Sequence, residues 1–369
     1  MAQRLTELAV YGFRALNRFE VPNLADVNLF VGKNSTGKTT LLEAIRLVMA
    51  GDIRPRLYSL LADRDEYSFR RWQNDRQLSN GEALEVAFEA LFYGRPELWK
   101  MPGFEISGGA GQPRISIRFV WLRVERNEDA SVRYFQVHDE DMEDAIPGFE
   151  IEREPGIKGL LPLDRFNRVV MRRQLRDTVA EKSVFLASSG MTPEEIGEMW
   201  DGVALTDDED EVVEALRIIA PTLEKLVMVQ SPEGRGAGRM LMAKVSTFQS
   251  PIPFKSLGEG ATHLLSVTLA LIKARGGTLL IDEVANGIHY SVQPALWKII
   301  FAQAAHHQIQ VFATTHSLDC VRALHRADEG VSDTVGALFR LESVGDQIKV
   351  VSFNAREIAI IDEDEIEVR

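Results

Sequence analysis

The fold is decided by the stretch Val31-Gly32-Lys33-Asn34-Ser35-Thr36-Gly37-Lys38-Thr39-Thr40. It is a complete G-x-x-x-x-G-K-[ST] loop that follows the apolar run 27–31 and precedes the helical pattern of residues 41–45. This setting suits phosphate binding, because glycines let backbone N–H groups turn inward around a polyphosphate and a helix N-terminus attracts the same anion. We expect Lys38 to reach the β- and γ-phosphates of a nucleotide and Thr39 to hold Mg²⁺ through its hydroxyl.

The composition bounds the class of protein. A chain of 369 residues allows one large or two ordinary domains, and its 45% hydrophobic and 26% charged content is ordinary for a globular protein. The net charge of −13 does not argue for nucleic acid as a partner, although a local basic stripe could still bind it.

The single cysteine, Cys320, excludes an internal disulfide, fits a reducing compartment and is best interpreted as a small buried apolar side chain. The N-terminus has no apolar signal region, and the longest apolar stretch, 264–272, is far shorter than the ~20 residues that span a bilayer. These features predict a cytoplasmic protein with no membrane partner.

Apolar and polar residues alternate over most of 83–154, including the series Leu84, Val86, Phe88 and Ala90, which predicts antiparallel strands with turns at 108–111 and 126–129. Before this region, residues 51–80 show no clean periodicity. After Pro155 we expect a partly helical segment and then a short buried strand at 184–187. Thr192 and Thr206 are each followed by acidic residues in the pattern of a capped helix start.

The last third of the chain alternates helices and strands. Helices are expected from Gly258 to about residue 275 and at 292–304 and 317–325, and strands at 279–281 and 310–313. This order predicts a parallel sheet with right-handed crossovers. Hairpins are expected over 226–245 and 336–351.

Three more motifs carry chemistry. Thr278-Leu279-Leu280-Ile281-Asp282-Glu283 is an apolar strand that ends in two carboxylates, where Asp282 fits a Mg²⁺ ligand and Glu283 could polarise the attacking water. His316 follows the strand 312–315, at the edge of an α/β sheet where ligands bind, and could hydrogen-bond a γ-phosphate. Ser256-Leu257-Gly258-Glu259-Gly260 is a Gly-rich turn that opens a helix, a second potential anion site.

In this order the motifs resemble those of ABC-type ATPase heads. Residues 32–40 are similar to Walker A, 256–260 to the signature loop, 279–283 to Walker B, and His316 to the switch histidine. The opening stretch 5–14 and the run 282–289 are similar to the RecF/SMC/OLD branch, and most of all to OLD-like AAA-family ATPases of bacterial phage-defence operons, without their Toprim nuclease domain.

The resemblance implies an α/β P-loop NTPase of ABC-ATPase type, with a mixed sheet, an antiparallel β-rich lobe and a helical lobe. One head would cover residues 1–369, with a Walker A lobe at 1–50, an inserted β-rich and then helical region at 51–205, and a signature, Walker B and switch-histidine lobe at 206–369.

The same resemblance implies that heads dimerise, or form larger homo-oligomers, around ATP held between one chain's Walker A and the other chain's signature loop. The implied nucleotide contacts are Gly32, Lys33, Asn34, Ser35, Thr36, Gly37, Lys38, Thr39, Thr40, Ser256, Gly258, Glu259, Gly260, Asn286 and His289. Lys38, Glu283 and His316 would be catalytic, and Thr39 and Asp282 would bind Mg²⁺. Ser256 departs from the family pattern because it precedes Leu257, and the Q-loop glutamine cannot be placed between Gln73 and Gln174.

These features predict an ATP-hydrolysing sensor or scaffold in bacterial antiviral defence, acting with a separately encoded effector. Two alternatives stay open: a RecF-like DNA-repair ATPase and a slow, nucleotide-stabilised scaffold. Arginines at 54–76 and 165–176 would either contact nucleic acid or form intramolecular ion pairs. We interpret the acidic runs at 138–141, 207–210 and 362–365 as a solvated turn, a helix N-terminus and an acidic tail rather than metal sites.

Overall fold

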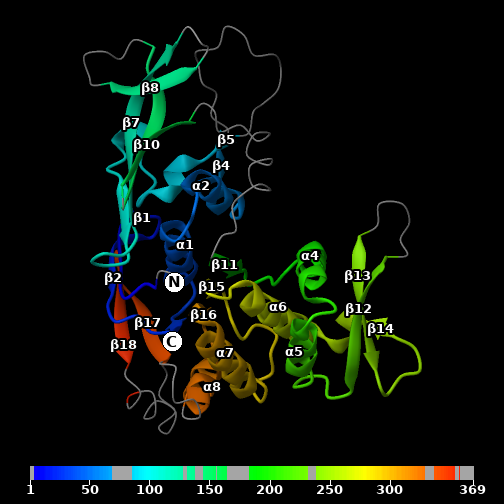
Figure 1. Cartoon of the computed structure of the whole chain (residues 1–369). Helices are drawn as coiled ribbons and strands as arrows, with labels where there is room; N and C mark the ends of the chain where they lie inside the picture. The colour runs from blue at the N-terminus through cyan, green and yellow to red at the C-terminus, as the bar shows by residue number, and fades with distance from the viewer. Residues whose placement is uncertain are drawn as a thin grey trace.

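The computed structural model describes residues 4–68, 85–127, 131–137, 144–154, 156–163, 183–231, 238–328, 336–353 and 357. Its strands form two large sheets, a three-stranded sheet and a two-stranded sheet. In Figure 1 one large sheet stands above and beside helix α1 (Lys38–Val48). The helices α6 (Glu259–Lys273), α7 (Gln293–His307) and α8 (Leu318–Asp328) flank the strands of the other large sheet. The arrangement confirms the predicted α/β class with an antiparallel lobe and a helical lobe.

The central sheet runs β11 (Ser183–Leu186), β15 (Thr278–Ile281), β16 (Gln310–Thr315), β3 (Val27–Val31), β17 (Gly336–Val344) and β18 (Gln347–Phe353). The first five strands are parallel and β18 closes the sheet as an antiparallel hairpin partner of β17, so the sheet is mixed, as predicted. Every residue of β3, β15 and β16 is buried. Parallel strands covered on both faces need such continuous apolar runs.

The two faces of the central sheet belong to different cores. Leu29, Ile281 and Val311 pack with α6 (Glu259–Lys273), α7 (Gln293–His307) and α8 (Leu318–Asp328). Their neighbours in the strands point the other way, because side chains alternate along a strand. Those neighbours, Phe30, Leu280 and Phe312, pack with the Walker A helix α1 (Lys38–Val48) and the second sheet.

The second sheet is antiparallel throughout. Its order is β10 (Ile157–Pro162), β9 (Ile146–Glu154), β7 (Arg114–Arg126), β6 (Phe104–Ser107), β1 (Leu8–Phe13) and β2 (Leu16–Val21), with β8 (Val132–Val137) also paired to β7. The alternating pattern at 104–154 therefore predicted its strands correctly. The expected helical character after Pro155 is wrong for β10, because Gly156 adopts a positive φ of 83° and turns the chain back onto β9.

One helix was not predicted from the sequence. The segment thought to lack periodicity contains α2 (Ile53–Ala62), whose N-terminus is capped when the N–H of Arg54 donates to Asp52. The strand expected around Phe88 is instead a 3₁₀ turn, η1 (Phe88–Leu91), because the ladder between β4 (Tyr67–Ser68) and β5 (Glu85–Val86) ends at Val86. A second 3₁₀ turn, η2, spans Leu98–Lys100.

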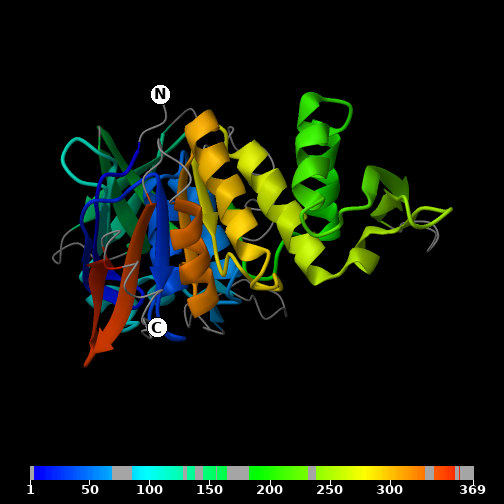
Figure 2. The ribbon, with the colours of Figure 1, turned by 90° about the horizontal axis from the view of Figure 1, so that it is seen from below.

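The helical lobe carries α4 (Pro193–Val203), α5 (Asp207–Leu216), the antiparallel strands β12 (Leu223–Gln230), β13 (Arg239–Val245) and β14 (Ile252–Pro253), and the 3₁₀ turn η4 (Phe254–Leu257). Figure 2 shows these yellow-green strands at the end of the molecule opposite the red β17 and β18. Thr192 and Thr206 cap α4 and α5 as predicted, and the acidic run 207–210 forms the first turn of α5, where Asp208 pairs with Arg275. Among the described residues, no helix is both long enough and apolar enough to cross a bilayer.

Candidate active site

The Walker A loop folds around the side chain of Lys38. Gly37 has a φ of 86°, a left-handed conformation that favours glycine, and a Cβ there would lie 2.8 Å from the Cδ1 of Ile348, which would have to shift. Lys38 is buried, and its Nζ donates to the carbonyl oxygens of Gly32 at 2.8 Å and Lys33 at 3.1 Å. Lys33, Asn34 and Ser35 form the exposed rim of the loop. The ammonium group is therefore held at the centre of the loop, where a phosphate would bind.

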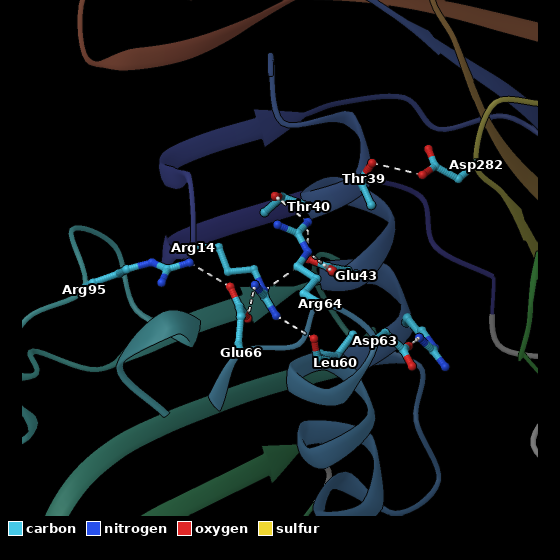
Figure 3. Close-up of polar contacts among 11 residues, drawn as sticks. Arg14, Thr39, Thr40, Glu43, Leu60, Asp63, Arg64, Glu66, Arg95 and Asp282 are labelled. Carbon is cyan, nitrogen blue, oxygen red and sulfur yellow. Dashed lines mark hydrogen bonds and ion pairs between the residues drawn. The ribbon is translucent and has the colours of Figure 1, made fainter. Parts of the chain in front are cut away.

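Asp282 lies directly after β15 and faces this loop. Its Oδ2 accepts a hydrogen bond from the hydroxyl of Thr39 at 3.0 Å, and its Oδ1 accepts one from Thr314 at 2.6 Å. Figure 3 shows the Thr39 hydroxyl and the Asp282 carboxylate pointing toward each other. These hard oxygen donors fit Mg²⁺, which P-loop enzymes bind through one hydroxyl, one carboxylate and substrate phosphates. Among the described residues, no group of three or more His, Cys, Asp or Glu side chains is arranged to hold a metal ion by itself.

Glu283 occupies a backbone conformation that is uncommon for a residue with a side chain, with φ at 54°. Its N–H donates to the Thr314 hydroxyl at 2.9 Å, and its Oε2 accepts from both Nδ1 (2.8 Å) and the backbone N–H (3.2 Å) of His316. Its Oε1 lies 3.9 Å from Lys38 Nζ. The predicted base, the predicted switch histidine and the Walker lysine are therefore neighbours.

Thr314 joins Asp282 to Glu283, and sequence reasoning did not single it out. The two predicted parallel strands were a partial signal, but the register that sets Ile281 opposite Ala313, and so brings Thr314 beside Asp282, comes only from the structure. A hydroxyl there can donate to one carboxylate and accept from the next backbone N–H.

The signature loop meets a different part of the chain. Ser256 lies in η4, Gly258 adopts a φ of 97°, and α6 begins at Glu259. Ser256, Gly258 and Glu259 are exposed, whereas Gly260 lies against Gly287, inside the predicted Asn286–His289 run.

The two predicted seam residues make local contacts. The amide of Asn286 donates to the carbonyl of Ser188 at 2.9 Å, and the Nδ1 of His289 lies 2.9 Å from the hydroxyl of Ser291. Both residues are exposed. The structure thus places the signature loop and the seam run on one surface of the chain.

A buried ionic network supports the Walker A helix. Arg14 lies between Glu43, at 3.1 Å, and Glu66, at 2.7 Å, and the side chains of all three are less than 10% exposed. Arg64 makes two hydrogen bonds to Glu43, at 2.7 and 2.9 Å, and a longer one of 3.4 Å to the Thr40 hydroxyl. Figure 3 shows these side chains gathered beside α1. Burial raises the pKa of Glu43, although the charges of Arg14 and Arg64 oppose that shift.

Two arginines of the first Arg-rich stretch form intramolecular ion pairs. Arg54 pairs with Asp52 and Arg64 with Glu43. Other predictions lie outside the described residues: the arginines at 70–76 and 165–176, the candidate glutamines Gln73 and Gln174, and the acidic runs at 138–141 and 362–365.

Fold and site together define the class: the chain is a P-loop ATPase of the ABC type that hydrolyses ATP. It belongs to the family described as "AAA domain, putative AbiEii toxin, Type IV TA system", which matches residues 125–320, and the "AAA ATPase domain" family matches residues 4–89. The first match contains the signature and Walker B motifs, and the second contains Walker A.

A curated relative and a solved structure agree with this class. An "ATP/GTP phosphatase" of Helicobacter pylori (strain ATCC 700392 / 26695) is 20% identical over 340 residues, which cover 87% of each protein. The structure of an SMC head bound to the C-terminal winged-helix domain of ScpA superposes with a TM-score of 0.50 at 13% identity, covering 95% of this chain and 97% of that one. This likeness shows the shared fold.

Proposed function

We propose that this chain is an ATP-driven switch that assembles around Mg-ATP and acts as a sensor or scaffold beside a separately encoded effector in bacterial antiviral defence. The observation that carries the switch is the convergence of Lys38, Thr39, Asp282 and Glu283, which come from segments about 240 residues apart in sequence. Nucleotide binding at the edge of the central sheet would connect the N-terminal and C-terminal motifs of the chain.

In this proposal Lys38 leaves the carbonyls of Gly32 and Lys33 and binds the β- and γ-phosphates. Thr39 and Asp282 hold Mg²⁺, which supplies charge neutralisation on the phosphate oxygens. Glu283 orients the attacking water and accepts its proton. His316, which now donates to Glu283, turns its exposed ring toward the γ-phosphate.

The assembly step uses the exposed signature loop. Ser256, Gly258 and Glu259 are open to solvent at the N-terminus of α6, a position that favours an anion. We place the γ-phosphate of a second chain's ATP against this loop, with Gly260 beneath it and Asn286 and His289 at the seam. ATP then joins two heads, and its hydrolysis releases them.

Support for a second component comes from the family description, which names a type IV TA (toxin–antitoxin) system, since such a system pairs a toxin with an antitoxin. The SMC head whose fold this chain shares is itself recorded with a bound partner domain. Both facts support an ATPase that acts on or with another protein, whereas neither favours a DNA-repair role.

The test is sedimentation of purified wild type and Glu283→Gln, each with and without Mg-ATP. The variant should bind ATP without hydrolysing it, so it should shift to a dimer or larger species only when Mg-ATP is present. Lys38→Ala in the Glu283→Gln background should abolish the shift. If the sedimenting mass of none of these proteins changes with Mg-ATP, the switch proposal is contradicted, and a slow, nucleotide-stabilised scaffold becomes the better description.

A further inference from the structure

The first turn of the signature helix α6 packs closely against the turn at residues 283–287, which follows Walker B. A Cβ atom on Gly260 would lie 2.8 Å from the carbonyl oxygen of Gly287, which is closer than side-chain carbons approach an oxygen. A Cβ atom added to Gly287 would in turn lie 3.6 Å from the Cβ of Glu259, which is ordinary van der Waals distance. If α6 moves, its first turn must therefore either carry residues 283–287 with it or separate from them.

One turn further along α6, a buried histidine makes a direct bond to the same segment. His263 is 6% exposed, and its Nε2 lies 3.0 Å from the carbonyl oxygen of Val284, 21 residues away in sequence. A carbonyl only accepts hydrogen bonds, so Nε2 carries the proton and donates. Burial lowers the pKa of His263, which keeps the ring neutral at pH 7 with one fixed tautomer.

Val284 is the residue directly after the predicted base. Its N–H donates to the carbonyl of Thr314 at 2.9 Å, so its two backbone polar groups are held by β16 on one side and by α6 on the other. Glu283 lies between this anchored residue and Asp282 and has the positive φ of 54°. A residue in so sparsely populated a conformation keeps it only where the surrounding structure enforces it.

We propose that His263 is a positioning residue that couples the signature loop to Glu283. It acts through the Val284 carbonyl, so that the position of α6 sets the orientation of the Glu283 carboxylate toward the attacking water. The role of Glu283 and the trans signature contact belong to the proposed function, on which this inference rests. His263 touches no phosphate in this scheme. Through this coupling, the rate of hydrolysis in one chain would depend on whether the ATP held by the partner chain contacts the signature loop of the first.

The experiment compares three variants of His263 with one matched control. His263→Leu fills the space without a donor, His263→Gln carries an amide N–H near the position of Nε2, and His263→Asn carries one too short to reach Val284. The control is Thr268→Val, because Thr268 is also buried on α6 but its hydroxyl donates to Leu264 of the same helix. The measured quantities are kcat, the Kd for Mg-ATP and the melting temperature.

We expect His263→Leu and His263→Asn to lower kcat by about 10- to 100-fold with little change in Mg-ATP affinity, because Walker A is untouched. His263→Gln should restore most of the rate, and Thr268→Val should leave it near wild type. A purely structural role would instead lower the melting temperature and kcat of the Leu, Asn and Thr268 variants together, without rescue by Gln. That outcome, or an unchanged kcat in folded His263→Leu and His263→Asn, would overturn the proposal.

Sedimentation in the Glu283→Gln background separates this inference from the proposed function. His263→Leu should still assemble with Mg-ATP there, because the histidine acts on the catalytic carboxylate and not on nucleotide binding. If Glu283→Gln alone does not assemble, the switch fails, whereas loss of assembly only after His263→Leu is added contradicts the coupling role.

Discussion

The hydroxyl of Thr39 donates a hydrogen bond of 3.0 Å to a carboxylate oxygen of Asp282, which joins the first turn of α1 to the end of β15. The two residues are 243 positions apart in sequence, and both face the same edge of the central sheet. Through this hydrogen bond the Walker A and Walker B motifs are in direct contact and form one site. Its chemistry leads to the first prediction.

Replacing Thr39 by Val should remove one of the two protein oxygens proposed for Mg²⁺ and leave Asp282 without this donor. We expect the affinity for Mg-ATP to fall by about 10- to 100-fold, the range typical of lost metal-site partners. Thr39→Ser keeps the hydroxyl and should stay near wild type. Titration of a fluorescent ATP analogue with Mg²⁺ and with EDTA checks this, because the difference between variants should vanish in EDTA.

Replacing Arg14 by Met should destabilise the fold, because Glu43 and Glu66 would be left buried with less compensation. Breaking a buried ion pair from one side costs about 3–5 kcal/mol in the free energy of unfolding. Arg18→Met is the control, since Arg18 follows on the same hairpin with a side chain that is 75% exposed. Urea unfolding of both variants measures the effect, and equal stabilities would show that the network contributes little.

The stability of the protein should fall in mild acid through His263. Its pKa is lowered in the folded state, mainly by burial, so below about pH 6.5, the ordinary value for histidine, the unfolded chain binds the proton more readily. Stability therefore decreases as the pH drops from 6.5 toward the folded pKa and does not change through this group above 6.5. The difference in unfolding free energy between wild type and His263→Gln, measured from pH 8 to pH 5, should shift in favour of the variant over that interval.

The only cysteine should be inert in the native protein. Cys320 is fully buried at α8, and burial raises the pKa of its thiol to about 12, so almost no thiolate is present near neutral pH. A thiol reagent at pH 8 should therefore modify the native chain only at the rate of unfolding and should modify it at once in denaturant. Rapid labelling of the native protein would show that α8 opens locally.

The sequence determined the parts of this protein that depend on local pattern. The Gly-rich loop around Lys38, the apolar strand before Asp282 and the strand before His316 each carry their own signal, because strand burial and helix capping act over a few residues. The same holds for the capped helix starts at Thr192 and Thr206. The class of ATPase was implied by the resemblance of these motifs, in their order, to ABC-type heads.

Local pattern was less reliable where arginines and proline obscured it. Helix α2 carries Ile53, Leu57, Leu60 and Leu61 on one buried face, a helical spacing that the sequence does contain. Its arginines, Arg56 included, made the segment look irregular. The sequence failed to predict β10 for another reason. A strand that follows a glycine turn is stabilised by pairing with its partner, here β9, more than by its own composition.

Only the tertiary structure decided which side chains meet. Thr314 became the bridge between Asp282 and Glu283, and His263 became the donor to Val284, because parallel pairing and helix packing brought together residues 21 to 32 positions apart. Arg14 forms buried ion pairs with Glu43 and Glu66, and these residues are too far apart in sequence for any local pattern to predict the contact. Such contacts depend on register and on the packing of distant elements, and a buried polar group is stable only where those elements supply its partner.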